Sequence, residues 1–330
     1  MDRTPLVFSQ SRTLRNLLAD IAEATRALNT IHVGLESVAE GHGGQGAVVR
    51  AWPKPKTAEK ARAYADEAST FACRSAIVFA AEVFDSYLCG LANEEWAAIS
   101  IATREIVLQT QTRKKKDGGG RSVAERAEAL LAELGSQDPL KIAALDLLVR
   151  WRNLVAHDSK DSRSLHKTRI ATLTKCADEF QSRQRPLNIV QALEHYDAGR
   201  PPLPIEVTTL IAFSVRLAQE IDVAVIARAV STISKFEHTA DLILKAHFDL
   251  KNRTLVSLNK EMDKFRNADP STRRHFIRSI LSRSGLSPRK PGSLRAKKGA
   301  KLVELPEAYL QEVSQLRHED FKKRFTTLLR

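Results

Sequence analysis

Residues 205–248 read IEVTTLIAFSVRLAQEIDVAVIARAVSTISKFEHTADLILKAHF and form the longest helical pattern in the chain. Apolar side chains cover a broad stripe of this pattern, as they do in a well-buried helix. The segment 76–92 (AIVFAAEVFDSYLCGLA) is also apolar, although Glu82 and Asp85 interrupt it. Strand-like alternation of polar and apolar residues does not extend beyond a few positions. The sequence therefore predicts an all-α fold built around long core helices.

Start and stop signals place the helices of the N-terminal half. A long amphipathic helix is predicted over residues 11–40 and a second over 57–89, with a glycine-rich segment at 41–46 between them. Asn93 is predicted to cap a third helix, which fades into a basic loop at 113–120. These signals divide this part of the chain into separate helices rather than one continuous one.

Recognisable caps open several later helices. The residues SVAE at 122–125 have the form of a capping box and open a short helix to Leu134. Asp138 precedes a proline at a first helical position, and the helix that follows is predicted to end near His157. Further helices are predicted up to about Arg183, after Asp269-Pro270, and over 306–329. Three parts result: an N-terminal helix and linker (1–56), a helical bundle (57–250) and a basic helical C-terminal region (251–330).

The overall composition indicates an ordinary globular protein. Of its 330 residues, 43% are hydrophobic and 28% charged, and aromatic residues are few, which favours helices over sheets. The three cysteines form no CxxC pair, so neither a disulfide framework nor a zinc site is expected. The N-terminus lacks the apolar run of a signal peptide, and no stretch of about 18 uncharged apolar residues occurs. We therefore expect a cytoplasmic protein without a membrane partner.

Positive charge is concentrated near the C-terminus. The formal net charge is +13, and ten Lys or Arg residues without a single acid lie between Arg273 and Lys301. Such a field attracts polyanions, and each phosphate contact releases counterions. A solubilising tail is the alternative interpretation. The expected RNA-binding residues are Arg273, Arg274, Arg278, Arg283, Arg289, Lys290, Arg295, Lys297 and Lys298.

One short motif carries chemistry. The sequence contains no phosphate-binding glycine loop, no HExxH and no GxSxG. What remains is Arg152-Asn153-Leu154-Val155-Ala156-His157, at the end of an apolar helical lead-in. Arg150, seven positions before His157, also fits a permissive Arg-to-His spacing, but Arg152 is preferred because Asn153 follows it.

This motif resembles that of the HEPN family of helical nucleotide-binding and RNA-cleaving domains, in which an Arg, usually followed by a polar residue, precedes a His. The apolar segment 76–92 is similar to the family's early core helix, and the resemblance covers roughly residues 57–248. It implies a HEPN-like helical bundle, here with a long N-terminal helix and a basic helical C-terminal extension. It also implies a homodimer whose active cleft forms where two motifs meet.

The residue types suit RNA cleavage without a metal or another cofactor. RNA supplies its own nucleophile, the 2′-hydroxyl, and a His can move protons at neutral pH. Arg152 suits the developing charge of the phosphate, and Asn153 suits orienting the His or holding a phosphate oxygen. We expect His157, Arg152 and Asn153 to be catalytic, and Glu82, Asp85 and Arg150 to be auxiliary.

Structural explanations stay open for the same residues. A His at a helix C-terminus is favoured by the helix dipole alone, and Arg152 can simply pair with Glu82 or Asp85. The leading hypothesis is a metal-independent HEPN-type endoribonuclease, acting as a toxin or anti-phage effector and paired with an antitoxin or regulatory partner protein. The alternative is a catalytically inactive HEPN-like module that binds RNA or nucleotide, and a third is a purely structural helical adaptor.

Overall fold

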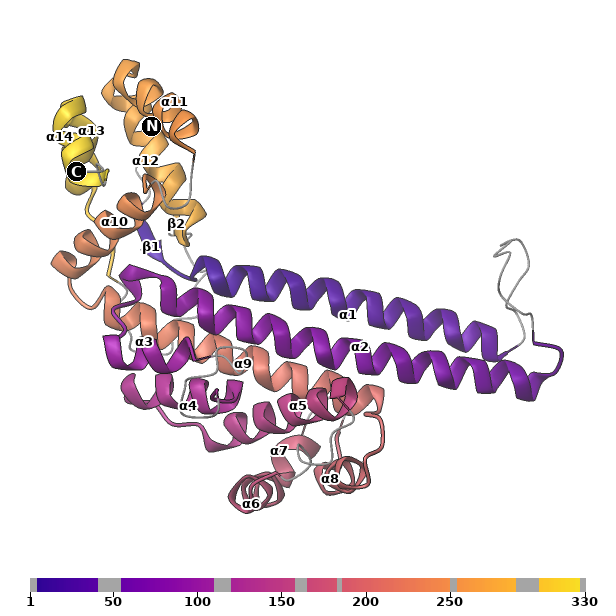
Figure 1. Ribbon diagram of the computed structural model, residues 1–330. Helices are drawn as coiled ribbons and strands as arrows, with labels where there is room; N and C mark the ends of the chain where they lie inside the picture. The colour runs from indigo at the N-terminus through magenta and orange to yellow at the C-terminus, as the bar shows by residue number, and fades with distance from the viewer. Residues whose placement is uncertain are drawn as a thin grey trace. The chain divides into compact units, whose positions relative to one another are not determined.

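The computed structural model describes residues 5–40, 55–109, 120–157, 165–182, 186–249, 254–288 and 303–326. These residues form fourteen α-helices, one short 3-10 helix and one two-stranded sheet (Figure 1). The prediction of a predominantly helical fold is confirmed. The two three-residue strands are an addition that the sequence pattern did not indicate.

The chain divides into two compact units, each built from segments distant in sequence. Unit 1 comprises Met1–Arg15, Gly90–Arg104 and Glu220–Arg330, and unit 2 comprises Asn16–Cys89 and Glu105–Gln219. The boundaries expected from the sequence, at residues 56 and 250, do not coincide with the boundaries of these two units. The reason is that α1, α2, α3 and α9 each contribute residues to both units, which a boundary drawn along the chain cannot represent.

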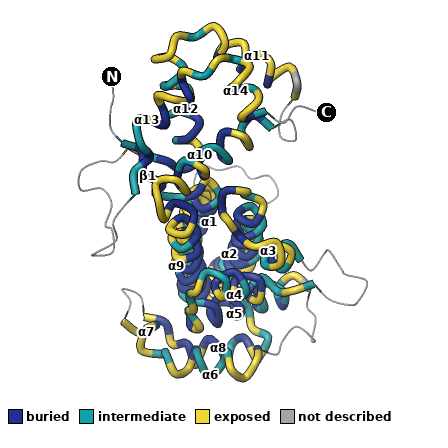
Figure 2. Tube along the Cα trace, turned by 90° about the vertical axis from the view of Figure 1, so that its left-hand side faces the viewer, coloured by how far each residue is buried: buried dark blue, intermediate teal, exposed yellow. Residues whose placement is uncertain are grey.

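Unit 2 is a helical bundle. In Figure 1, α1 and α2 lie side by side, and α4 and α5 lie on the side of α2 that faces away from α1. Figure 2 shows that the inner faces of α1, α2 and α9 are buried. The Tyr87 hydroxyl of α2 donates to the Ala218 carbonyl of α9 at 2.9 Å. The helices of this unit, some of which continue into unit 1, are α1 (Arg12–Ala39), α2 (Ala58–Asn93), α3 (Ile101–Val107), α4 (Val123–Glu133), α5 (Pro139–His157), α6 (Lys167–Lys175), α7 (Ala177–Gln181), α8 (Ile189–Asp197) and α9 (Pro204–Ala229).

The capping signals place several helix starts correctly. Ser122 accepts a hydrogen bond from the Glu125 amide, and the Glu125 carboxylate accepts one from the Ser122 amide, which completes the predicted capping box of α4. Asp138 accepts from the Lys141 amide at 2.9 Å at the start of α5. Each such bond satisfies a backbone donor that the first turn leaves free.

Some predicted continuous helices are interrupted. The segment 205–248 contains two helices, α9 and α10 (Ile233–His247), because Thr232 leaves the helical conformation and caps α10 through the Lys235 amide. The single helix predicted up to Arg183 is likewise divided into two helices, and so is the one predicted over 306–329. Asn93 is the last residue of α2 rather than the cap of a third helix, and a 3-10 helix at Glu95–Ala97 follows.

Unit 1 combines the small sheet with the C-terminal helices. Strand β1 (Leu6–Phe8) pairs antiparallel with β2 (Leu286–Pro288). Gly285, before β2, has φ +119°, and a Cβ there would lie 1.8 Å from the Gln10 carbonyl oxygen, so only glycine fits. A cluster of phenylalanine rings, which includes Phe248, Phe265 and Phe321, forms part of its core. Its remaining helices are α11 (Leu255–Asn267), α12 (Pro270–Arg283), α13 (Glu307–Gln315) and α14 (His318–Phe325).

Helix α2 is long and apolar enough to cross a membrane by length and composition. Its most apolar 18-residue window has a mean hydropathy of 1.4, and half of that window is buried within the protein. The core helix of a water-soluble bundle has the same character, and α2 contacts α4, α5 and α9 through Asp85, Glu82 and Tyr87. From the sequence we expected no stretch apolar enough to span a membrane, but α2 meets the length and composition criterion for such a stretch.

Candidate functional site

The last two turns of α5, in unit 2, carry the candidate motif. Trp151 is fully buried, its indole N–H donates to the Arg200 carbonyl at 3.1 Å, and its ring packs edge-on against Tyr196. Leu154 is buried beside it. This anchoring fixes the rotation of α5 about its own axis. The positions on the opposite side of the helix from Trp151 and Leu154 therefore face outward.

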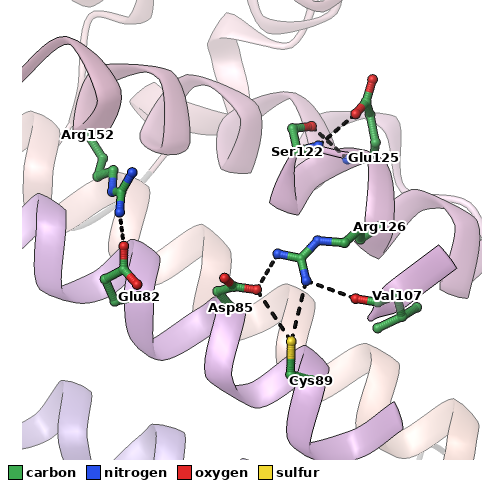
Figure 3. A network of polar contacts seen from close by, with 8 residues as sticks. All are labelled: Glu82, Asp85, Cys89, Val107, Ser122, Glu125, Arg126 and Arg152. Atoms are coloured by element: carbon green, nitrogen blue, oxygen red, sulfur yellow. Dashed lines mark hydrogen bonds and ion pairs between the residues drawn. The ribbon is translucent and has the colours of Figure 1, made fainter. Parts of the chain in front are cut away.

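Arg152 lies at the surface in an ion pair. Its Nη2 donates to a carboxylate oxygen of Glu82 on α2, and its Nη1 donates to the Asn153 Oδ1 atom at 2.9 Å (Figure 3). The Arg152 side chain is 24% exposed and that of Glu82 is 53% exposed. Within the described part of the chain, the buried Nε of Arg152 has no hydrogen-bond partner. The guanidinium is therefore oriented by two neighbours but still open to solvent.

His157 is the final residue of α5, and its side chain lies outside the described part of the structure. The helical register still places its position. At about 100° per residue, position 157 lies roughly 140° around the helix from position 152, but only about 40° from position 153 and 20° from position 150. Within one copy of α5, Arg152 and position 157 therefore flank the exposed face from opposite sides, with the exposed Ala156 between them.

Arg150, the alternative arginine, has an ion pair of its own. Its Nε donates to the Asp146 Oδ1 atom at 3.0 Å, one helical turn earlier. Asp146 is buried, and burial raises the pKa of its carboxyl group, although the charge of Arg150 acts in the opposite direction. A buried carboxylate needs such a partner, so this pair has a structural reason to exist.

Asp85, expected as an auxiliary acid, is paired with a residue outside the motif. Its carboxylate is paired with Arg126 of α4, which is 1% exposed and also donates to the Val107 carbonyl at 2.8 Å and to the Cys89 sulfur at 3.4 Å (Figure 3). Burial is the largest cause that raises the pKa of the Cys89 thiol, and the negative charge of Asp85 raises it further. This partly buried cluster joins α2, α3 and α4, and two of these helices, α2 and α4, contact α5.

Sequence reasoning did not single out Arg126. The available signal was its place on α4 among buried Ala124, Ala127 and Leu130, where an arginine interrupts the apolar stripe. A buried cation requires an anion, and the acid at position 85 interrupts the apolar stripe of α2 in the same way. Pairing the charged residue that interrupts the apolar stripe of α4 with the one that interrupts the stripe of α2 would have predicted the ion pair between Arg126 and Asp85.

The described members of the basic window differ in their surroundings. Arg273 donates to the carbonyls of Phe265, Arg266 and Leu316, and both Arg274 and Arg278 pair with Glu307 of α13. These three hold unit 1 together, whereas Arg283 is exposed. The other expected RNA-binding residues lie outside the described residues: Arg289, Lys290, Arg295, Lys297 and Lys298.

No protein-family model matches this sequence, and no curated protein or solved structure matches it either. Among the residues that the structure describes, no group of three or more His, Cys, Asp or Glu side chains is arranged to hold a metal ion. The geometry thus defines a class only: a predominantly helical protein with a partly exposed Arg–Asn pair at the end of a core helix.

Proposed function

We propose that this protein is a metal-independent endoribonuclease of the HEPN type, acting in the cytoplasm as a toxin or anti-phage effector. The observation that carries the proposal is the partly exposed Arg152, in the last turns of α5 and five residues before His157. It is paired with its neighbour Asn153 and with Glu82 of α2. An antitoxin or another regulatory protein would keep such an enzyme inactive until it is needed.

The ion pair with Glu82 gives Arg152 a resting position. Exposed ion pairs contribute about 0–1 kcal/mol, so a phosphodiester can replace the carboxylate at little cost. The guanidinium would then donate to the phosphate oxygens, and Asn153, already within hydrogen-bond reach of Arg152, would contact the same group. The histidine would take the proton of the 2′-hydroxyl or give one to the leaving 5′-oxygen.

We further propose that two copies of the chain build the active cleft. Position 157 lies about 140° from position 152 on α5, so a phosphate held by Arg152 is not faced directly by the His of the same copy. A two-fold axis places the same patch opposite itself and can bring one copy's Arg152 to the other copy's His157.

The exposed face of α2 offers a surface for such a dimer. Tyr64, Phe71 and Phe79 are 36%, 73% and 42% exposed. Their spacing keeps them within roughly 80° of one another around the helix, on the side that also carries Glu82. Exposed aromatic residues in a stripe are typical of interaction surfaces, and this stripe is continuous with the Arg152 ion pair.

A second candidate is an inactive HEPN-like module that binds RNA or nucleotide and regulates another protein. It is favoured by the fact that two of the three guanidinium nitrogens of Arg152 already have partners within one chain. In this alternative the ion pair is permanent, and Arg152 serves to join α5 to α2.

The test is RNA cleavage in excess EDTA. We expect the wild-type chain to cleave single-stranded RNA and to leave 2′,3′-cyclic phosphate ends. His157→Ala should slow cleavage by about 10²- to 10⁴-fold, and Arg152→Gln by about 10²-fold. His238→Ala serves as the matched control, because His238 is an exposed histidine on α10.

Two outcomes would contradict the proposal. Activity that EDTA abolishes and Mg²⁺ restores would exclude the metal-independent mechanism. Loss of activity in Arg150→Gln but not in Arg152→Gln would instead assign the cation to Arg150, whose position shares a face of α5 with position 157.

A further inference from the structure

A cavity in unit 2, separate from the Arg152 motif, has the composition of a ligand site. Its volume is about 690 Å³, within the range of roughly 300–1,000 Å³ that small-molecule sites occupy. One wall is α1, a second is the first turn of α9, and Pro186 forms a third. The lining residues are Leu28, Asn29, His32, Val33, Glu36, Pro186, Pro204, Ile205 and Thr208.

The walls of this cavity are held in place from behind. The His32 ring lies with Nδ1 3.4 Å from the Ser69 hydroxyl and Nε2 3.9 Å from the Cys73 sulfur, both on α2. At the start of α9, the Leu203 amide donates to the buried Glu206 carboxylate at 2.6 Å, and His195 bonds to the same carboxylate at 2.8 Å. These contacts hold the inner side of the cavity in place, whereas its rim, which includes Val33 and Glu36, is exposed to solvent.

The thiol behind His32 is not reactive. Burial, followed by the charge of Glu206, raises the pKa of Cys73 to about 11, so it stays protonated near neutral pH. Cys73 is therefore not a candidate nucleophile beside the cavity.

The charge of the lining selects the class of ligand. Glu36 is the acidic residue among the described lining residues, and its side chain is exposed. The Thr208 hydroxyl already donates to the Pro204 carbonyl at 2.9 Å, which leaves its oxygen as an acceptor. A phosphate or carboxylate would meet a carboxylate here, whereas an ammonium group would meet an anion and neutral acceptors.

We propose that this cavity binds a small organic amine, an ammonium group carried on an apolar chain or ring. The ammonium pairs with Glu36, and the apolar part lies against Leu28, Ile205 and the prolines 186 and 204. The proposal is independent of the RNA-cleaving activity, because it concerns a different surface of unit 2 and uses none of the motif residues.

Binding of four probes to the full-length chain tests the proposal: hexylamine, 1-hexanol, hexanoate and adenosine monophosphate, each titrated at pH 7 by ligand-observed NMR. Hexylamine should bind most tightly, with a Kd of roughly 1 mM, as expected for so small a molecule. Glu36→Gln should weaken hexylamine binding about twofold to fivefold, because Glu36 is exposed, and leave hexanol unaffected. Glu23→Gln, an exposed acid on α1 outside the cavity, is the matched control.

A second variant locates the ligand. Thr208→Phe fills the cavity and should reduce hexylamine binding more than tenfold. Equal binding of hexanol and hexylamine, tighter binding of hexanoate or adenosine monophosphate, no binding of hexylamine, or no effect of either variant on hexylamine would each overturn the assignment.

Discussion

At the scale of the residue, Arg152 and Arg126 show how differently two arginines in ion pairs can behave. Arg126 is 1% exposed, so removing its partner Asp85 would leave a buried charge, which typically costs about 3–5 kcal/mol. Arg152 is 24% exposed and its partner Glu82 is 53% exposed, so that pair can be exchanged for a ligand. The surroundings of each arginine, not its residue type, decide whether it supports the fold or contacts a substrate.

A buried acid in unit 1 gives a prediction about pH. Asp222 is 1% exposed, and its Oδ2 accepts from the Ser11 amide at 2.9 Å, before the start of α1. Burial raises the pKa of Asp222, although the Ser11 bonds oppose this. The folded state then binds a proton more tightly than the unfolded state, so the contribution of Asp222 to stability decreases as pH rises through the raised pKa.

Replacing Asp222 by Asn removes this titration and keeps an oxygen to accept from Ser11. We expect the stability of Asp222→Asn relative to wild type to increase as pH rises through the raised pKa of Asp222, because only the wild type then has to ionise a buried carboxyl group. Urea denaturation at several pH values measures this difference. Asp263→Asn, an exposed acid on α11, is the control. A difference that is constant with pH, or that changes in the opposite direction, would show that Asp222 does not titrate in this way.

At the scale of the element, α12 divides the basic window into two parts. Ile277, Ile280 and Leu281 are buried, and Arg274 and Arg278 pair with Glu307, so α12 belongs to the core of unit 1. Deleting the whole window would remove this helix and disturb unit 1. Residues 289–301, which follow α12 and β2 in the sequence, can be altered to test RNA binding without changing α12.

We predict that changing Arg289, Lys290, Arg295, Lys297 and Lys298 to Gln weakens RNA binding and leaves the melting temperature unchanged. If each residue contacts a phosphate, the slope of log affinity against log salt concentration should decrease by up to about 3.5, at about 0.7 per contact for single strands. Fluorescence anisotropy with labelled RNA at several salt concentrations measures the slope. The comparison variant, Arg274→Gln with Arg278→Gln, should instead destabilise unit 1. An unchanged slope in the first variant would identify residues 289–301 as a solubilising segment.

At the scale of the whole molecule, the proposed active cleft needs two chains. We predict that Arg152→Gln and His157→Ala chains, each inactive alone, recover cleavage when they are mixed and allowed to exchange subunits. A heterodimer restores one complete Arg–His pair across the two-fold axis, so up to a quarter of the wild-type activity is expected for a random mixture that contains about half heterodimers. Cleavage of labelled RNA by the mixture is the measurement.

The control for this experiment is Phe71→Arg, a change on the exposed stripe of α2. Phe71 is 73% exposed, so the variant should fold, but it should be a monomer by light scattering and lack activity. If the mixed chains stay inactive although they form heterodimers, or if the wild-type chain is an active monomer, the composite cleft is wrong.

The sequence by itself determined the local elements. Propensity, capping residues and prolines act within a few positions, so the starts of α4, α5 and α12 and both ends of α1 could be read directly. The candidate motif was equally visible, because its six residues are contiguous. The break at Thr232 was missed because neither Gly nor Pro marks it and the pattern on both sides is apolar, although Thr232 is a residue type that favours helix N-caps.

The tertiary structure alone decided which distant residues meet. Glu82 and Asp85 lie on the same helix and were expected to act together, yet one contacts Arg152 and the other contacts Arg126. Their separation by three residues turns them about 60° apart around α2, so each faces a different neighbouring helix. Likewise, the cavity beside His32 combines residues from α1, the segment before α8 and α9, which lie far apart in the chain. Local periodicity defines the faces of each helix, but only packing defines what each face contacts.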